Sequence, residues 1–193
     1  MKRGFPVTIK ITVTAFCTAI NIVGAYVALA LRLPIYLDSI GTILDSVLLG
    51  PAFGMTAACL SGIFSGVTSD PYAFYFMPVG MITGLLAGFL FRAGWFRKRR
   101  LFLGVILLTA PGTVVSSCVA AFLFGGVTSS GSSVLVQILH RAGLGMAASA
   151  FVVQILTDYL DRLISVAIIN ATSSRLGGRL TKLLGGGKSN GTL

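Results

Sequence analysis

Long apolar stretches alternate with three short basic clusters along this chain of 193 residues. A helix that crosses a bilayer needs about 20 mostly apolar residues, because its backbone groups find no water in a hydrocarbon layer roughly 30 Å thick. At least four segments of the chain meet this requirement. The pattern therefore predicts a protein that crosses a membrane several times. The basic clusters are Lys2, Arg3 and Lys10; Arg97, Lys98, Arg99 and Arg100; and Arg175, Arg179, Lys182 and Lys188.

The positions of these clusters predict the topology. Short loops rich in Lys and Arg stay on the cytoplasmic side, so an even number of spans must separate each cluster from the next. We therefore expect an all-α membrane protein, a six-transmembrane-helix bundle with its N and C termini in the cytoplasm.

Composition narrows the class of protein further. The chain is 55% hydrophobic and carries a net charge of +10, and its mean hydropathy is +0.92. In a soluble domain this charge would suggest nucleic acid, but here it lies at predicted membrane edges, where it attracts anionic headgroups. We expect a lipid bilayer and no nucleic acid as partner. The three cysteines lie in apolar segments, which indicates neither a disulfide framework nor a metal site.

Proline and glycine divide the first half of the chain. A first helix is predicted over residues 7–31, ended by Pro34 because the residue before a proline disfavours helix. The apolar block 35–67 is divided at Gly50 and Pro51 into two rather short helices that form a hairpin.

The next two spans follow an aromatic-rich entry. A fourth helix should end at about Trp95, beside the central basic cluster, and a fifth should cover residues 101–124 with a kink at Pro111 and Gly112. Residues 125–133 then form an outer loop rich in Gly and Ser.

Residues 134–176 admit one long helix or two. Two full spans would place the last basic cluster outside, so we favour one span preceded by a helical or re-entrant outer piece, the span starting near Ala147 or as late as Asp158. Residues 1–176 would form a single six-helix membrane domain, and residues 177–193 a flexible basic cytoplasmic tail.

The residues offer little for catalysis. His140 is the one histidine, and the chain has no zinc-protease, serine-hydrolase or phosphate-loop motif. We expect no enzyme activity, no catalytic residues and no cofactor. Asp158 and Asp161 resemble a paired-carboxylate site, but Arg162 follows directly, so a charge network at a helix end is the alternative.

Polar residues on the outer side are the candidates for binding a ligand. Arg141 lies there against the topological bias, with Gln137 and His140 nearby, and arginine can bind a carboxylate through two parallel hydrogen bonds. A contact with lipid phosphate or a salt bridge to Asp158 is the alternative. Aromatic side chains of the outer loops could supply the apolar walls of a pocket, or could simply be an interfacial belt. The candidate ligand-binding residues are Tyr36, Tyr72, Phe74, Tyr75, Gln137, His140, Arg141 and Asp158.

Other groups lie within the predicted spans. Asn21 could equally form an interhelical hydrogen bond or serve function, and Asp45 has no identifiable partner. Small residues four apart on the first helix, Ala15 with Ala19 and Gly24 with Ala28, would permit another helix to approach closely. That helix could belong to this chain or to a partner.

With these residues considered together, the chain resembles the S component, the substrate-binding membrane subunit, of an energy-coupling-factor (ECF) vitamin transporter. The resemblance rests on six spans in under 200 residues and on the alanine pair of the first helix. It also rests on three segments: LPIYLDSIGT at 33–42, LLGP at 48–51 and DYLDRLISV at 158–166.

The resemblance implies a division of labour. An S component captures a vitamin at the outer face of a prokaryotic plasma membrane and then associates with a T component and two cytoplasmic ATPases. Ala15 and Ala19 match the family's docking motif for the T component. The outer basic residues favour an anionic vitamin such as pantothenate, with cobalamin or riboflavin next.

Two other classes of protein compete with this interpretation. A stand-alone secondary transporter would usually show an inverted repeat and coupling charges in the membrane. A structural membrane partner would leave the outer aromatic and basic residues without a use.

Overall fold

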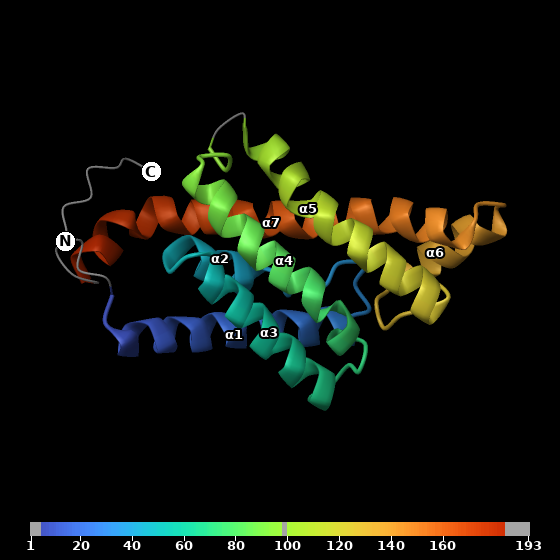
Figure 1. The fold of residues 1–193 in the computed structure, drawn as a ribbon, viewed down its shortest axis with the longest axis horizontal. Coiled ribbons are helices and arrows are strands. Elements are labelled where there is room, and N and C mark those ends of the chain that lie inside the picture. Colours follow the sequence, from blue (N-terminus) through green and yellow to red (C-terminus); the bar gives the residue numbers. More distant parts are fainter. Residues whose placement is uncertain (1–4, 98–99, 184–193) are drawn as a thin grey trace.

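The computed structural model describes residues 5–97 and 100–183, with side chains through residue 171. Every regular element in this part of the chain is helical. α1 (Val7–Ala30) and α7 (Met146–Leu183) run along the long axis of the molecule, and α3 (Pro51–Thr68), α4 (Ala73–Arg92) and α5 (Leu101–Cys118) cross it obliquely (Figure 1). α2 (Ile40–Leu48) and α6 (Ser132–Arg141) are short.

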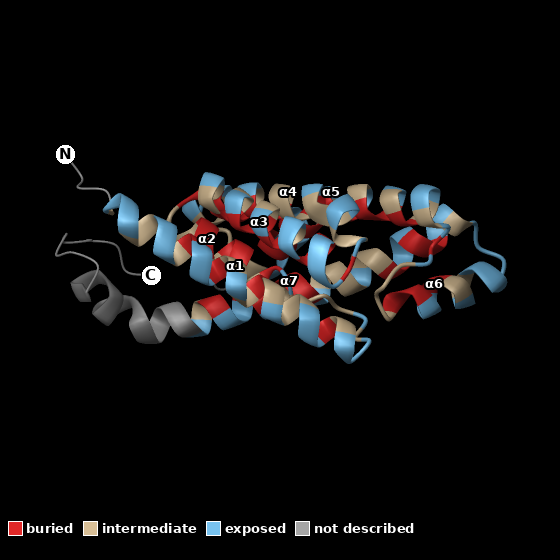
Figure 2. Cartoon of the chain, turned by 90° about the horizontal axis from the view of Figure 1, so that it is seen from below, coloured by how far each residue is buried: buried red, intermediate tan, exposed pale blue. Residues whose placement is uncertain are grey.

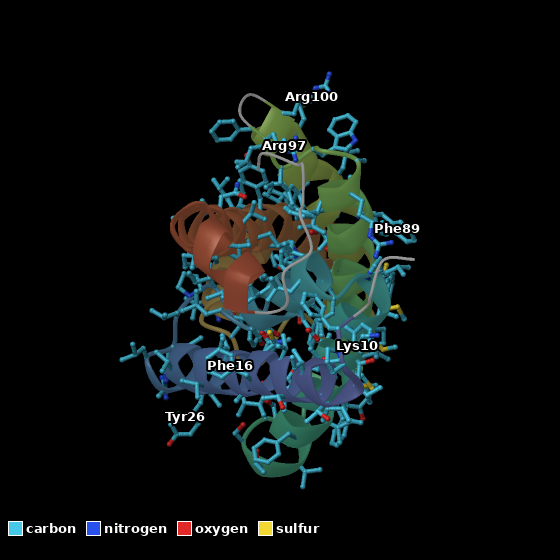
Figure 3. The ribbon with its side chains drawn as sticks, turned by 90° about the vertical axis from the view of Figure 1, so that its left-hand side faces the viewer. Lys10, Phe16, Tyr26, Phe89, Arg97 and Arg100 are labelled. Atoms are coloured by element: carbon cyan, nitrogen blue, oxygen red, sulfur yellow. The ribbon has the colours of Figure 1, made fainter. Side chains whose placement is uncertain are left out.

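Four helical segments are long and apolar enough to cross a membrane: Val7–Ala30, Pro51–Thr68, Ala73–Arg92 and Leu101–Leu123. Their outward faces carry large apolar side chains, and exposed surface covers much of the outside of the bundle (Figure 2). Tyr26 and Phe89, for example, extend away from the bundle (Figure 3). A bilayer would cover such surface, so the fold is that of a multi-pass membrane protein.

The predicted count of six spans is not established by these helices. α2 has nine residues, which extend only about 14 Å. α7 carries three charged side chains within two turns, at Asp158, Asp161 and Arg162. The six-helix count therefore stays a prediction.

The ends of several helices lie together. The start of α1, the end of α4 and the end of α7 lie toward one end of the molecule, and α6 lies at the other (Figure 1). Figure 3 views that end and labels Lys10, Arg97 and Arg100. That this end faces the cytoplasm stays a prediction. The other residues of the basic clusters either lie outside the described residues or have no described side chain.

The predicted turn between the second and third helices is present. Gly50 has a φ of +115°, which a residue with a side chain rarely adopts, and Pro51 occupies the first turn of α3. α3 then crosses α4 at close range. A Cβ on Gly84 of α4 would lie 2.6 Å from the carbonyl carbon of Gly54 on α3, so the crossing needs glycine there.

The second helix is shorter than predicted. Helix was expected from residue 35, but α2 begins at Ile40, and residues 31–39 form a loop. Leu37 in this loop has a φ of +53° and donates its N–H to Asp161 on α7, so its N–H is bonded to α7 instead of to a helical turn. Tertiary contact here overrides the local apolar pattern.

Asn21 on α1 caps the start of α2. Its Oδ1 accepts the backbone N–H groups of Gly41 at 2.8 Å and Thr42 at 3.2 Å, and its Nδ2 donates to the Thr42 hydroxyl at 2.8 Å. These N–H groups lie in the first turn of α2, where backbone N–H groups have no acceptor within the helix. Of the two roles considered for Asn21, the interhelical hydrogen bond is the one observed.

The last part of the chain is one short helix followed by one long helix, the arrangement favoured from the sequence. α7 starts at Met146, but it is not among the described helices that are long and apolar enough to cross a membrane, so the start of the last span stays a prediction. α5 continues through Pro111 and becomes π-helical only at η2 (Val119–Leu123). α7 remains helical to Leu183, which includes the first residues of the predicted tail, and residues 184–193 lie outside the described structure.

Candidate functional site

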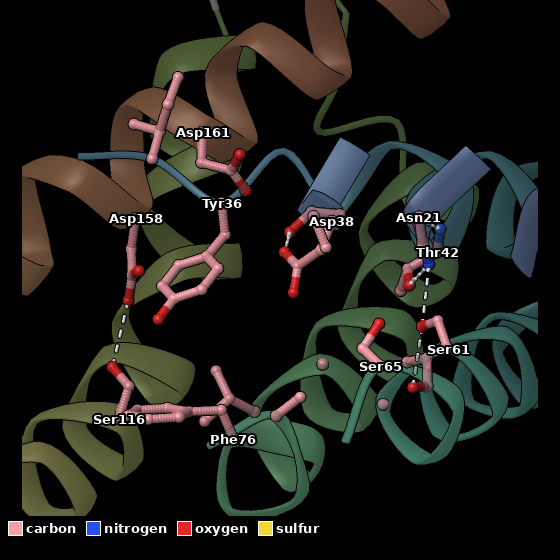
Figure 4. A pocket seen from close by; sticks show the side chains of 18 of the residues that line it. Asn21, Tyr36, Asp38, Thr42, Ser61, Ser65, Phe76, Ser116, Asp158 and Asp161 are labelled. Atoms are coloured by element: carbon pink, nitrogen blue, oxygen red, sulfur yellow. Dashed lines mark hydrogen bonds between the residues drawn. The ribbon is translucent and has the colours of Figure 1, made fainter. Parts of the chain in front are cut away.

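An internal pocket lies among α1, α3, α4, α5, α7 and the loop 31–39 (Figure 4). The cavity volume of the pocket is about 90 Å³, which is several times what one water molecule needs. Its apolar walls are Ala25, Leu29, Pro34, Ile35, Ala58, Ala73, Phe76, Met77 and Val79. Its polar lining is Asn21, Tyr36, Asp38, Ser39, Thr42, Ser61, Ser65, Ser69, Asp70, Ser116, Ser132, Gln154, Thr157, Asp158, Asp161 and Arg162.

A charge network from α7 forms one wall of this pocket. The spacing of three and four residues places Asp158, Asp161 and Arg162 on one face of the helix. Nη1 of Arg162 lies 3.7 Å from Asp158 Oδ1 and 3.8 Å from Asp161 Oδ2, and the Arg162 side chain is only 6% exposed. One nitrogen therefore serves two carboxylates, both beyond hydrogen-bond range. A charge network is present, as considered from the sequence, but it lies within α7 and inside the protein instead of at a helix end.

Hydroxyl groups of neighbouring helices complete this network. Asp158 Oδ2 accepts from Thr113 at 2.8 Å and from Ser116 at 3.3 Å, both on α5. Arg162 Nη2 donates to the Thr83 hydroxyl on α4 at 3.2 Å, while its Nε is buried without a hydrogen-bond partner in the described structure. These contacts from α4 and α5 hold the charged groups of α7 in place.

Asp38 projects from the loop 31–39 into the same space (Figure 4). The residue is exposed, and it is one of those that line the pocket. Its Oδ1 accepts a hydrogen bond from the neighbouring Ser39 hydroxyl at 3.3 Å. Desolvation raises the pKa of this carboxyl and Asp158 raises it further, against the opposing effect of the Arg162 charge.

Three loops are joined at one end of the pocket. The Tyr36 hydroxyl lies 3.1 Å from Ser129 Oγ, which donates to Asp70 Oδ2 at 2.5 Å. The backbone N–H of Gly131 donates to Leu33 O at 3.2 Å. Burial raises the pKa of Tyr36 to about 12, so its hydroxyl stays protonated at neutral pH. Loops distant in sequence thus close the pocket together.

Most of the predicted aromatic wall lies elsewhere. The rings of Tyr72 and Tyr75 contact Phe124, with centroids 4.7 Å and 5.1 Å away, and neither residue lines the pocket. Phe74 lies against Gly66 on α3. Tyr36 does line the pocket, together with Phe76, which was not among the candidates.

The predicted polar candidates on α6 are also separated from the pocket. Gln137 donates to the Gly125 carbonyl at 3.2 Å, and the His140 ring lies 2.9 Å from the Leu144 carbonyl. Arg141 is exposed and borders a shallow groove with Gln137. Asp158 pairs with Arg162, so the salt bridge considered between Arg141 and Asp158 is not the one formed. Of the predicted ligand residues, the structure brings together Tyr36 and Asp158.

The pocket includes groups that the sequence reasoning did not select as binding residues. Asp38 stood within the LPIYLDSIGT segment, and Arg162 was named only as a partner of the acidic pair. The polar character of both positions next to apolar segments was the available signal. Within the described residues, no group of three His, Cys, Asp or Glu side chains could hold a metal ion.

The two small-residue pairs of α1 face different ways. Ala28 is buried, and a Cβ on Gly24 would meet the Leu37 backbone, so this pair packs inside the bundle. Ala15 and Ala19 are exposed, on the side away from the buried Thr14 and Asn21. This second pair is open to an outside partner.

Comparison with known proteins agrees with this geometry. The sequence model of the family described as ECF transporter, substrate-specific component, matches residues 9–173. A search of curated proteins and a search of solved structures each gave no match. With a membrane-spanning helical bundle around a pocket with polar lining, and a match over most of its length, the chain belongs to the family of substrate-specific components of ECF transporters.

Proposed function

We propose that the pocket between α1, α4 and α7 is where this subunit captures a small water-soluble vitamin at the outer face of the membrane. The observation that carries the proposal is the pocket itself: a hollow within the helical bundle, with apolar walls and convergent polar groups, is what a small-molecule site requires. The charge network of α7 supplies polar groups already fixed in position.

The loops that close the pocket would control entry of the ligand. Tyr36 and Ser129 belong to segments 93 residues apart, and one hydrogen bond between their side chains joins these segments over the pocket. Such a bond contributes about 1 kcal/mol, so breaking it costs little free energy. Opening of this contact would admit the ligand, and its re-formation would retain it.

Delivery would use the exposed small residues of α1. Lipid provides no hydrophobic drive for helix association, so close packing over small side chains is what favours docking. Ala15 and Ala19 leave such a surface free. A T component carrying two cytoplasmic ATPases would dock there and supply the energy for release to the cytoplasm.

Two substitutions on the same helix test capture and docking separately. Ala25 lines the pocket, whereas Ala15 lies outside it. Ala25→Trp should fill the pocket and abolish ligand binding by the isolated chain. Ala15→Trp should leave binding within about threefold of the parent while preventing association with the T component and ATP-dependent uptake.

The measurement combines identification and titration of the ligand. The full chain is purified in lipid nanodiscs, and the small molecule that travels with it is identified by mass spectrometry and then titrated by calorimetry. Normal binding by Ala25→Trp would exclude this pocket as the site. Normal uptake by the Ala15→Trp variant would exclude the docking surface and leave the pocket unaffected.

A further inference from the structure

Carboxylates outnumber cations in the pocket. Its lining holds Asp38, Asp70, Asp158 and Asp161, against the single guanidinium of Arg162. Three of the four carboxylates have contacts that stabilise their charge. Asp161 accepts the Leu37 N–H at 2.9 Å, Asp158 accepts two hydroxyls, and Asp70 accepts the Ser129 hydroxyl and the Tyr72 N–H.

Asp38 is the exception in this group. Its carboxylate accepts one hydrogen bond, from Ser39, and extends into the open space of the pocket. Arg162 is already shared between the other two carboxylates of the network. A carboxylate that faces a pocket with a single hydrogen bond depends on water or on a ligand for its remaining partners. Arg162 is the one cation in the described lining of the pocket, and its charge is divided among several carboxylates, so the lining holds more negative than positive charge.

Aromatic rings stand beside this position. The Tyr36 side chain extends into the space between Asp38 and Asp158, and Phe76 lies across it (Figure 4). The face of an aromatic ring attracts a cation and also stacks on a flat ring. The described residues offer no group that could chelate a metal ion, so the missing charge is better supplied by an organic molecule.

Resting on the capture function above, we propose that the ligand of this subunit is an organic cation, an amine or a nitrogen heteroaromatic ring, whose positive group binds Asp38 between Tyr36 and Phe76. Ser hydroxyls of α3 and α5, with Thr42 of α2 and Thr157 of α7, would accept or donate hydrogen bonds around the rest of the molecule. An anionic vitamin such as pantothenate would meet an excess of like charge in this pocket, which disfavours it.

The test uses three probes and one pair of isosteric variants on the full chain in nanodiscs. Thiamine is the cationic probe, pantothenate the anionic probe and riboflavin the neutral probe. Thiamine should bind at least about tenfold more tightly than pantothenate, and Asp38→Asn should weaken cation binding by about 30-fold or more. Asp45→Asn is the control, because it removes a carboxylate that lies inside the protein but does not line the pocket, and it should change binding by less than about threefold.

Failure of this inference is distinguishable from failure of the capture function. If pantothenate or riboflavin binds more tightly than thiamine, or if the co-purified molecule is an anion, capture stands and the cation proposal is wrong. Unchanged cation affinity in Asp38→Asn would likewise overturn the role of Asp38. If no probe binds and no small molecule co-purifies, the capture function fails, and the inference fails with it.

Discussion

Arg162 and Arg141 are chemically identical, but they lie in very different surroundings. Arg162 is 5% exposed and faces two carboxylates inside the bundle, whereas Arg141 stands in the open at the end of α6. Between exposed charges, water and salt screen the interaction, while inside a protein the same pair interacts several times more strongly. Burial, more than the presence of a cation, therefore indicates where charge matters in this molecule.

The largest difference is expected in stability. Arg162→Gln leaves Asp158 and Asp161 without their counterion, and breaking a buried ion pair in this way costs about 3–5 kcal/mol. Arg141→Gln, the matched surface change, should cost less than about 0.5 kcal/mol. Denaturant unfolding in the same detergent measures both variants. Adding Asp158→Asn to Arg162→Gln should recover part of the loss, and equal effects of the two single changes would contradict the comparison.

Acidification should weaken ligand binding through Asp38. A cation needs the ionised carboxylate, and the raised pKa means that protonation begins at a higher pH than for an ordinary aspartate. Affinity for a cationic probe should fall about tenfold for each pH unit below that pKa. Asp158, Asp161 and Arg162 face the same space. The pH dependence of binding by Asp38→Asn therefore separates the contribution of Asp38 from theirs. A pH profile identical in this variant and the parent would assign the effect to another group.

The same carboxyl should affect stability in the opposite direction. In the ligand-free chain, a raised pKa means that the folded state holds the proton more firmly than the unfolded state does. This contribution to stability is fully present in acid and is lost as the pH rises through the raised pKa. The unfolding free energy of the parent, compared with that of Asp38→Asn across the same pH range, measures it. A contribution that grows with pH would contradict the assignment.

Removing a tyrosine hydroxyl should weaken ligand retention when the tyrosine lines the pocket, and not when it lies outside. This difference should be smaller than the preceding ones. Tyr36→Phe removes the hydrogen bond to Ser129 that joins two loops, which should weaken ligand retention by about 1 kcal/mol, or roughly fivefold. Tyr75→Phe, on an exposed side chain outside the pocket, should have no measurable effect on binding. Dissociation rates of the bound ligand are the sensitive measurement. Equal rates for Tyr36→Phe and the parent would remove the loop contact from the mechanism.

The smallest effect is expected for Arg141→Ala on binding. Its side chain is exposed and borders only a shallow groove, so binding should change by less than about threefold. Calorimetric titration gives the dissociation constant. A loss of 30-fold or more would restore the hypothesis, drawn from topology alone, that Arg141 holds the ligand.

Much of the architecture could be predicted from local patterns. The end of α1, the turn at Gly50 and Pro51, and the division of the last segment into a short and a long helix follow from proline, glycine and charge placement. Each depends on neighbouring residues, because helix breakers act on the backbone within one turn. The exposed alanine pair of α1 was also recognisable, although its orientation was not.

The site was less predictable, because its residues meet only through the fold. Positive charge on the outer side suggested Arg141, yet the pocket is built by Asp38 from a loop and by Asp158, Asp161 and Arg162 from α7. Residue 161 lies 124 positions from Leu37, whose N–H its carboxylate accepts. No spacing rule connects positions so far apart.

The sequence by itself determined that this chain is a helical membrane protein, which end of its helices carries the basic residues and which family it belongs to. These properties follow from hydropathy, charge and motifs, which are local quantities. Only the tertiary structure decided that loop 31–39 contributes to the interior and that Asp38 faces the pocket without a cation of its own. Burial and pairing of a charge depend on what surrounds it in space, and they are settled only when the helices have packed.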